Sequence, residues 1–350
     1  KKGKKIETTL QPSGQLHGHE KPIEQLVNYY NTRKVPQSII FSGPKGIGKS
    51  KLALTFSEQL MQDKKSITSH DLLSNFAASS NSKKVYICKR EFDEATNKYK
   101  SAISIDQIRK MKEFFSLSQT EYNWRIAIID AADEMNESSS NAILKLLEEP
   151  PNKSIIILIS HNYYSLKSTI ISRCQKITLK PLSEKEMGEF LSKEVNNQEE
   201  INLITSLSEG IPSLALNLTK EETLNTYKRL IDLVSNTENS TQSQIFDLIE
   251  SQKFGNQNEV SLDLIDLILI LIRRVIRSLL NDEDLITNDI ESQMFEKIVD
   301  QSNMTIILAE LYLDLEQTIA RAKRINIEKA DISLNCLTKL KTVFREKICL

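Results

Sequence analysis

The chain has 350 residues, of which 39% are hydrophobic and 27% charged, and its formal net charge is −1. This composition excludes a disordered or fibrous protein, and the length predicts two or three domains, because one core rarely extends over so long a chain. The nearly balanced charge excludes nucleic-acid binding through bulk charge, so any such contact must come from a local patch.

The sequence contains no segment that we expect to cross a membrane. The longest apolar run, from Leu262 to Ile272, is interrupted by two aspartates and is far shorter than the ~20 residues needed. No apolar signal core follows the basic start, Lys1-Lys2-Gly3-Lys4-Lys5, which we expect to be a solvated end. The four cysteines are far apart and form no C-x-x-C pair, which argues against zinc and disulfides. We therefore expect a cytoplasmic protein.

Short apolar runs alternate with amphipathic stretches over residues 15–180, a pattern typical of a parallel α/β sheet with crossover helices. The sequence predicts strands at Ser38–Phe41, Val85–Cys88, Ile126–Asp130, Ile155–Ser160 and Lys176–Leu179. It predicts helices at Glu24–Asn31, Ser50–Gln62, Ile105–Leu117 and Ser139–Glu149. The last helix must stop at Pro150-Pro151, because proline removes a donor and clashes with the preceding turn. The polar, serine-rich stretch Ser66–Ser82 is predicted to be a surface insertion.

The character of the chain changes at Lys180-Pro181-Leu182-Ser183, beyond which the periodicity is almost entirely helical. Ser183 is a good helix cap and acidic residues follow it. The segment Leu262–Ile276 is apolar on most faces, as expected of a helix buried in a bundle. We therefore predict three domains: an α/β nucleotide-binding domain over 1–180, a small helical domain over 181–222 and a helical domain over 223–350.

A phosphate-binding loop stands between the first predicted strand and its helix. Its residues fit G-x-x-x-x-G-K-[ST] without a mismatch, and they are Gly43, Pro44, Lys45, Gly46, Ile47, Gly48, Lys49 and Ser50. Glycines let backbone N–H groups surround phosphates, and the following helix adds its positive end. We expect ATP here, with Lys49 on the β- and γ-phosphates and Ser50 on Mg²⁺. The alternatives are a chance glycine-rich turn or a loop that no longer binds nucleotide.

The residues that would complete an ATPase are only partly present. Asp130 ends a predicted strand and is well placed to hold magnesium. Ala131 follows, where an ATPase of this layout would usually carry a glutamate, and alanine cannot activate water. The pair Asp133-Glu134 could replace that acid, but it lies past the strand end, on a turn. The sequence therefore predicts nucleotide binding with weak or absent hydrolysis.

Three segments together resemble one protein family. They are Asp130-Ala131-Ala132-Asp133, the run N-A-I-L-K-L-L-E-E-P-P from Asn141 to Pro151, and Ile171-Ser172-Arg173-Cys174. With the phosphate loop, they closely resemble the AAA+ clamp-loader subunits of bacterial DNA polymerase III, and among these the delta-prime type. The resemblance is strong over residues 15–180 and continues at pattern level into the C-terminal helices.

The resemblance implies an AAA+ module followed by a helical lid and a helical collar that holds a ring together. It implies a hetero-oligomer with delta and gamma or tau subunits, which loads the sliding clamp onto primed DNA. Arg173 of the S-R-C motif would act as an arginine finger in a neighbouring subunit's ATP site, where its planar charged fork can stabilise the γ-phosphate. A merely structural surface arginine is the alternative, and Cys174 is expected to be a packing residue.

Departures from the family pattern favour the delta-prime type over the gamma type. Ala131 replaces the glutamate, and Ser213 stands where active subunits carry a sensor arginine. No four-cysteine zinc module is present, and the polar segment Asp93–Lys100 occupies its place. The first sensor position is expected within residues 160–162, where His161 would be structural. The phosphate loop, which some delta-prime subunits have lost, is retained here and is compatible with ATP as a structural ligand.

Two other functions remain open from the sequence. A hydrolytically active gamma/tau-type clamp-loader ATPase would use the same loop. A small-molecule P-loop kinase would need one compact domain, whereas this chain continues with a long helical part. DNA contact is expected mainly through an assembled ring, with candidates Lys110, Lys112, Lys145 and Lys153 or none of these. We expect the arginines Arg273, Arg274 and Arg277 to pair with acids of a neighbouring subunit.

Overall fold

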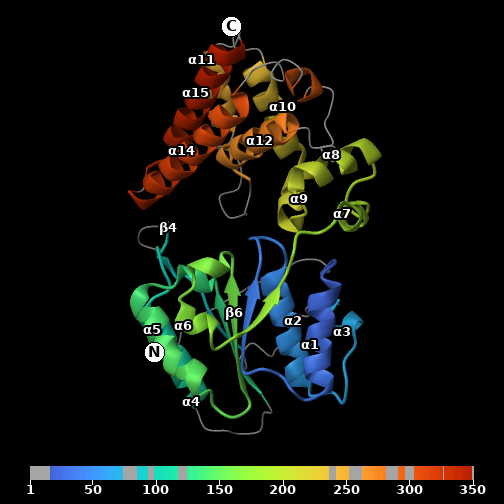
Figure 1. Cartoon of the computed structure of the whole chain (residues 1–350), viewed down its shortest axis with the longest axis vertical. Helices are drawn as coiled ribbons and strands as arrows, with labels where there is room; N and C mark the ends of the chain where they lie inside the picture. Colours follow the sequence, from blue (N-terminus) through green and yellow to red (C-terminus); the bar gives the residue numbers. More distant parts are fainter. Residues whose placement is uncertain are drawn as a thin grey trace, which may run out of the picture. The chain divides into compact units, whose positions relative to one another are not determined.

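The computed structural model describes residues 16–73, 85–93, 98–116, 124–235, 242–251, 262–280, 291–295, 303–325 and 327–348 (Figure 1). The basic N-terminal end and parts of the predicted insertions lie outside these ranges. The chain divides into two compact units, with the boundary between Glu186 and Met187. The further division of the helical part into a lid and a collar stays a prediction.

The first unit is built on a five-stranded parallel sheet of order β2-β5-β6-β1-β7. Its strands are β1 (Ser38–Ser42), β2 (Val85–Cys88), β5 (Arg125–Asp130), β6 (Ser154–Ser160) and β7 (Gln175–Thr178). All five predicted strands are confirmed, with ends that differ by at most one residue, and so is the α/β fold. Because the strands are parallel, the residues that follow β1, β5 and β6 meet at one edge of the sheet.

Helices cover both faces of this sheet (Figure 1). The elements are α1 (Glu20–Asn31), α2 (Lys49–Gln62), α3 (Ser69–Leu73), α4 (Ile105–Ser116), α5 (Glu137–Glu148) and α6 (Ser168–Ile171). Side chains alternate along each strand, so Ile39 and Phe41 pack in one core with α1 and α2. Ile40 packs in the other core, with residues of α4, α5 and α6. The sequence of β1 therefore determines which face each layer of helices covers.

Two local predictions in this unit have different outcomes. Helix α5 ends at Glu148, before the two prolines, as expected, and Asn136 caps its start by accepting a hydrogen bond of 2.8 Å from the Ser139 amide. The prediction of a surface insertion over Ser66–Ser82 is wrong for its described part. Ile67 and Leu72 are buried in the core beside α2, because α3 folds back onto that helix.

A small antiparallel hairpin of β3 (Phe92–Asp93) and β4 (Lys98–Tyr99) stands in the polar segment before α4. Phe92 and Tyr99 pack edge to face across it, with ring centroids 5.1 Å apart. A cross-strand aromatic contact of this kind stabilises a short hairpin. The polar segment that takes the place of a zinc module is therefore held by a ring pair in its described residues.

The described part of the second unit is entirely helical. Its elements are α7 (Glu184–Leu191, which begins in the first unit), α8 (Gln198–Ser208), α9 (Pro212–Leu218), α10 (Glu221–Ser235), α11 (Gln242–Ser251), α12 (Leu264–Leu279), α14 (Met304–Arg324) and α15 (Lys329–Ile348). The predicted start at Ser183 is confirmed, because Ser183 and Glu186 form a reciprocal capping box. Helix α12 is buried along most of its length, as predicted. No helix among the described residues is long and apolar enough to cross a bilayer.

Arg273 and Arg274 of α12 pair with acids of this chain, contrary to the prediction of contacts to a neighbouring subunit, whereas the prediction for Arg277 stays untested. Arg274 is completely buried, and its guanidinium donates two hydrogen bonds of 2.8 Å to the carboxylate of Glu291. Tyr227 donates to the same carboxylate at 2.5 Å. Arg273 forms an ion pair of 3.2 Å with Glu209. The apolar pattern of α12 masked this internal role, because a buried arginine cannot be recognised without its partner.

Candidate nucleotide-binding site

The phosphate loop needs glycine at its two ends. A Cβ atom on Gly43 would collide with the backbone carbonyl of Leu179, which follows β7. Gly48 has φ 109°, and a Cβ there would lie 2.7 Å from a methyl group of Leu16. Only glycine accepts this backbone and this close approach without strain. The glycines therefore let the loop lead from β1 directly into α2 while its backbone packs closely against Leu179 and Leu16.

Lys49 is a buried cation whose described partners are all neutral. Its Nζ atom donates hydrogen bonds to the carbonyl oxygens of Gly43, at 2.6 Å, and Pro44, at 2.5 Å. Burial lowers the pKa of Lys49 to about 8, although the charges of Asp133 and Asp130 oppose this shift. An ammonium group in such surroundings gains from a bound anion, so Lys49 is suited to phosphate oxygens.

Ser50 and Asp130 lie together, although they are far apart in the sequence. The Ser50 hydroxyl donates a hydrogen bond of 3.1 Å to Oδ2 of Asp130. A hydroxyl and a carboxylate are the oxygen ligands that Mg²⁺ prefers, usually beside waters and phosphate oxygens. These two side chains therefore fit a magnesium ion that accompanies a nucleotide.

The acids that follow Asp130 are engaged elsewhere. Ala131 is buried, so the usual position of the glutamate offers only a methyl group. The carboxylate of Asp133 accepts a hydrogen bond of 3.0 Å from the His161 backbone amide. Glu134 forms an ion pair of 2.6 Å with Arg90. Neither acid stands unpaired to activate a water molecule.

His161 follows β6 and lies within reach of the charges of this site. Burial and the charge of Lys49 lower its pKa, while Asp133 and Asp130 act in the opposite direction. Its Nδ1 atom is buried and has no hydrogen-bond partner among the described residues. The Ser160 hydroxyl is also buried and has no hydrogen-bond partner among the described residues. The structure thus places the expected sensor segment beside the phosphate loop, and its role stays a prediction.

His19 is a site residue that the sequence reasoning missed. It is buried, and its Nε2 atom lies 3.0 Å from the carbonyl oxygen of Ile47 in the phosphate loop. Burial lowers the pKa of His19. His19 has φ 63° and directly precedes α1. The only signal in the sequence is a histidine after Gly18 at a helix start, which is too common to indicate a contact with the loop.

The described hydrogen bonds of Arg173 go to residues outside the phosphate loop. Its guanidinium bonds to Glu148 of α5, at 2.6 Å, and to the carbonyl of Thr169 of α6, at 2.9 Å. Its side chain is one-third exposed, with a relative accessibility of 33%. Burial raises the pKa of the adjacent Cys174 to about 12, which makes that thiol unreactive at neutral pH.

The remaining predicted residues are distributed over both units. Lys110 and Lys112 lie on α4, Lys145 lies on α5, and Lys153 precedes β6. Helices α4 and α5 pack against each other, so the first three lysines belong to one layer of the fold. Ser213 is exposed on α9, in the second unit. None of these positions contributes a hydrogen bond to the phosphate loop among the described contacts.

Residues 18–183 match the model of the family described as "DNA polymerase III, delta subunit". This part of the chain is similar to the clamp-loader subunits of DNA polymerase III. The chain is 30% identical over 218 residues to the delta' subunit of Buchnera aphidicola subsp. Schizaphis graminum, covering 60% of this chain and 64% of that protein. It is 26% identical over 217 residues to the tau subunit of Bacillus subtilis, covering 57% of this chain and 36% of that protein.

A solved structure has the same fold as this chain. The crystal structure of a DNA polymerase III gamma subunit-related protein from Thermotoga maritima matches with a TM-score of 0.54 and 18% identity. The match covers 93% of this chain and 100% of that one. At this identity the likeness establishes the shared architecture, an α/β module followed by helices, and no more than that.

Proposed function

We propose that the protein is the delta-prime-type subunit of a DNA polymerase III clamp loader, which helps to load the sliding clamp onto primed DNA. In this role it binds ATP weakly or as a structural ligand, and it supplies Arg173 to a neighbouring ATPase subunit. One observation carries the proposal. The phosphate loop is intact, but the place of the catalytic acid is filled by the buried methyl group of Ala131.

Nucleotide binding is supported by the loop and the groups around it. The backbone from Gly43 to Ser50 would surround the phosphates, and Lys49 would exchange its loop carbonyls for phosphate oxygens. Ser50 and Asp130 would hold magnesium, which when bound neutralises phosphate charge. These residues bind and orient a nucleotide without requiring that it be cut.

Weak hydrolysis is supported by the hydrogen bonds of the nearby acids. A general base must reach the attacking water, and it must be able to accept a proton. Oδ1 of Asp133 accepts a hydrogen bond from the His161 amide, and Glu134 is paired with Arg90. These contacts hold both acids in place beside the site and reduce their availability as a base.

The donation of Arg173 in trans is supported by its position and its chemistry. A guanidinium has five N–H donors in a planar fork, and this one makes hydrogen bonds to three residues: Thr169, Ser172 and Glu148. It therefore keeps N–H donors for the γ-phosphate of an ATP molecule bound to another subunit. An arginine supplied in this way stabilises charge in the transition state and raises turnover by about 10³–10⁵-fold in known systems.

The partners of this proposed assembly are delta and gamma or tau subunits, the sliding clamp, and primed DNA reached through the complex. Relatives with delta', tau and gamma names support a hetero-oligomer. The chain spans 64% of the first of these relatives, so partners and activity are transferred as part of the proposal.

A gamma/tau-type ATPase is the second candidate. It is favoured by the intact loop and by a gamma relative from Buchnera aphidicola subsp. Schizaphis graminum at 27% identity, close to the delta' value. Hydrolysis separates the two candidates, because the motor would turn over ATP as a purified single chain. The delta-prime type would bind ATP and release little phosphate.

The test is the ATPase activity of a complex reconstituted from this chain, delta, gamma, clamp and primed DNA. We expect Arg173→Ala to reduce DNA-stimulated turnover by at least about tenfold, with assembly intact by gel filtration. Arg109→Ala is the matched control, since Arg109 is an exposed arginine on α4 that pairs with Asp106. Unchanged turnover with Arg173→Ala would make this arginine structural, and phosphate release by the isolated chain would favour the motor.

A further inference from the structure

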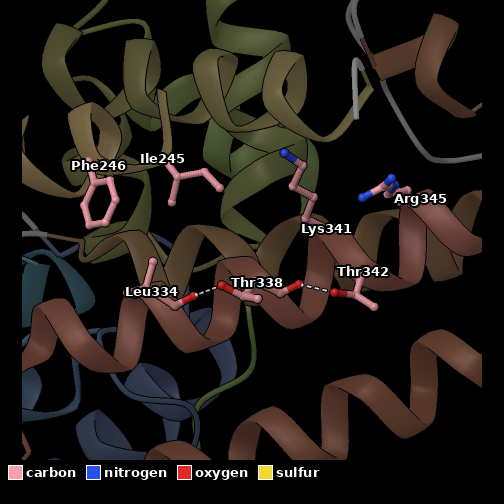
Figure 2. A pocket seen from close by; sticks show the side chains of 7 residues that line it. All are labelled: Ile245, Phe246, Leu334, Thr338, Lys341, Thr342 and Arg345. Atoms are coloured by element: carbon pink, nitrogen blue, oxygen red, sulfur yellow. Dashed lines mark hydrogen bonds between the residues drawn. The ribbon is translucent and has the colours of Figure 1, made fainter. Parts of the chain in front are cut away.

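A groove in the second unit runs between helices α11 and α15, with a volume of about 450 Å³ (Figure 2). The two helices pack directly against each other, so the groove lies along a single helix-to-helix contact. It is separate from the phosphate loop, which lies in the first unit. The groove has no part in the function proposed above.

The groove is apolar at one end and positively charged at the other (Figure 2). Ile245 and Phe246 of α11 face Leu334 of α15 at the apolar end. Phe246 is 53% exposed, so its ring is accessible to a ligand. Lys341 and Arg345 mark the other end, and the described residues that line the groove include no acid. This arrangement complements a ligand with an apolar part and a negative part.

The floor between these ends does not favour a phosphate ligand. Thr338 donates its hydroxyl proton to the carbonyl of Leu334, at 2.7 Å. Thr342 donates in the same way to the carbonyl of Thr338, at 2.8 Å. Both hydroxyl protons are therefore used within α15. A nucleic-acid strand would find the guanidinium of Arg345 here but no side-chain donor on the floor.

The length of the groove suits a helix. Leu334 and Arg345 are eleven positions apart on one helix, which corresponds to about 16 Å or three turns. The groove between two packed helices is the usual place for a third, whose side-chain ridges fit between theirs. An apolar anchor and an acid three turns apart on a third helix would reach the two ends at the same time.

We propose that this groove binds an amphipathic helix of a partner protein. That helix places an aromatic or aliphatic side chain against Phe246 and Leu334. It places an aspartate or glutamate, about three turns away, beside Arg345. Burial of Phe246 supplies most of the affinity, since the hydrophobic effect follows the apolar area removed from water. The ion pair at the other end fixes the direction of the helix.

The test uses the full chain and a displayed library of 18-residue helical peptides, randomised along one face. The selected peptides are measured by fluorescence anisotropy against the wild type, Phe246→Ala and Arg345→Glu. Arg321→Glu is the matched control, because Arg321 is an exposed arginine on α14 outside the groove. A 20-nucleotide single-stranded DNA and sedimentation of the chain alone are measured in parallel.

We expect the enriched peptides to carry an apolar anchor with an acid about eleven positions away. Their affinity should fall at least tenfold with Phe246→Ala and with Arg345→Glu, and stay within twofold with Arg321→Glu. Replacing the peptide's acid by lysine should restore binding to Arg345→Glu alone. Enrichment without this pattern, or equal binding by the groove variants, would overturn the proposal. Arg345-dependent binding of the DNA strand, or Phe246-dependent self-association, would also overturn it in favour of those occupants.

Discussion

Arg274 of the second unit and Lys49 of the first are both buried cations, and their surroundings are opposite in character. In the second unit, Arg274 meets both oxygens of Glu291, and a third bond goes to the hydroxyl of Ser206 at 2.8 Å. Burial alone would lower the pKa of Arg274, but the bonds to Glu291 and Tyr227 raise it overall. In the first unit, Lys49 has only carbonyl oxygens, and its pKa falls to about 8.

This difference distinguishes a buried charge that stabilises the fold from one that prepares a binding site. A buried charge with a matched partner holds helices together, whereas a buried charge without one is a position that gains from a ligand. Arg274 and its partners join α8, α10 and α12 to residue 291. Lys49 stands at the start of α2, where a phosphate chain would complete its coordination. The comparison makes four predictions.

The largest effect is expected for Glu291→Gln. This change leaves the buried guanidinium of Arg274 without its counter-charge, which costs about 3–5 kcal/mol for a pair of this kind. Urea unfolding followed by circular dichroism measures the loss. Glu310→Gln, at an exposed position on α14, is the control and should change stability by less than about 0.5 kcal/mol. A loss below about 1 kcal/mol for Glu291→Gln would contradict the structural role.

Lys49→Met should act on binding and not on folding. Removal of the unmatched ammonium should weaken Mg-ATP binding at least about 100-fold, close to 2.7 kcal/mol, because two phosphates lose their cation. The stability of the folded chain should stay the same or rise slightly, since a buried charge is replaced by an apolar side chain. Isothermal titration and urea unfolding measure the two quantities. A clear loss of stability with unchanged ATP affinity would show that Lys49 stabilises the fold and does not bind the ligand.

The affinity for ATP should depend on pH through Lys49. Its pKa of about 8 in the free chain means that the ammonium is mostly charged at pH 7 and mostly neutral at pH 9. Bound phosphates favour the charged form, so binding above pH 8 takes up a proton. We expect affinity to fall about tenfold from pH 7 to pH 9. Calorimetry in two buffers of different ionisation enthalpy detects the proton, and Lys49→Met should remove most of the dependence.

The smallest effect is expected for Glu148→Gln. The pair of Glu148 with Arg173 is half exposed, with side-chain accessibilities of 48% and 33%. Exposed pairs contribute about 0.2–1 kcal/mol, because water and salt screen them. Thermal unfolding should therefore change little, and 0.5 M salt should abolish the difference from the wild type. A loss of stability comparable to that of Glu291→Gln would show that exposure to solvent does not explain the difference in energy between the two ion pairs.

The sequence by itself determined the sheet of the first unit and its phosphate loop. The five strands, the phosphate loop and the proline stop after α5 depend on local pattern and spacing, which a sequence displays directly. Asp130 could be predicted near the loop because the carboxyl ends of parallel strands share one edge. The helix cap at Ser183 and the burial of α12 could also be predicted from local sequence patterns.

Only the tertiary structure decided which polar groups meet. It brought His19 to the carbonyl of Ile47, paired Arg274 with Glu291, and folded α3 onto α2 in a stretch predicted to be a surface insertion. Such contacts join residues that are far apart in the sequence and follow no periodic spacing. Their energy depends on burial and on the charge of the partner. Periodicity fixes helices and strands, but the matching of buried polar groups is a property of the packed chain.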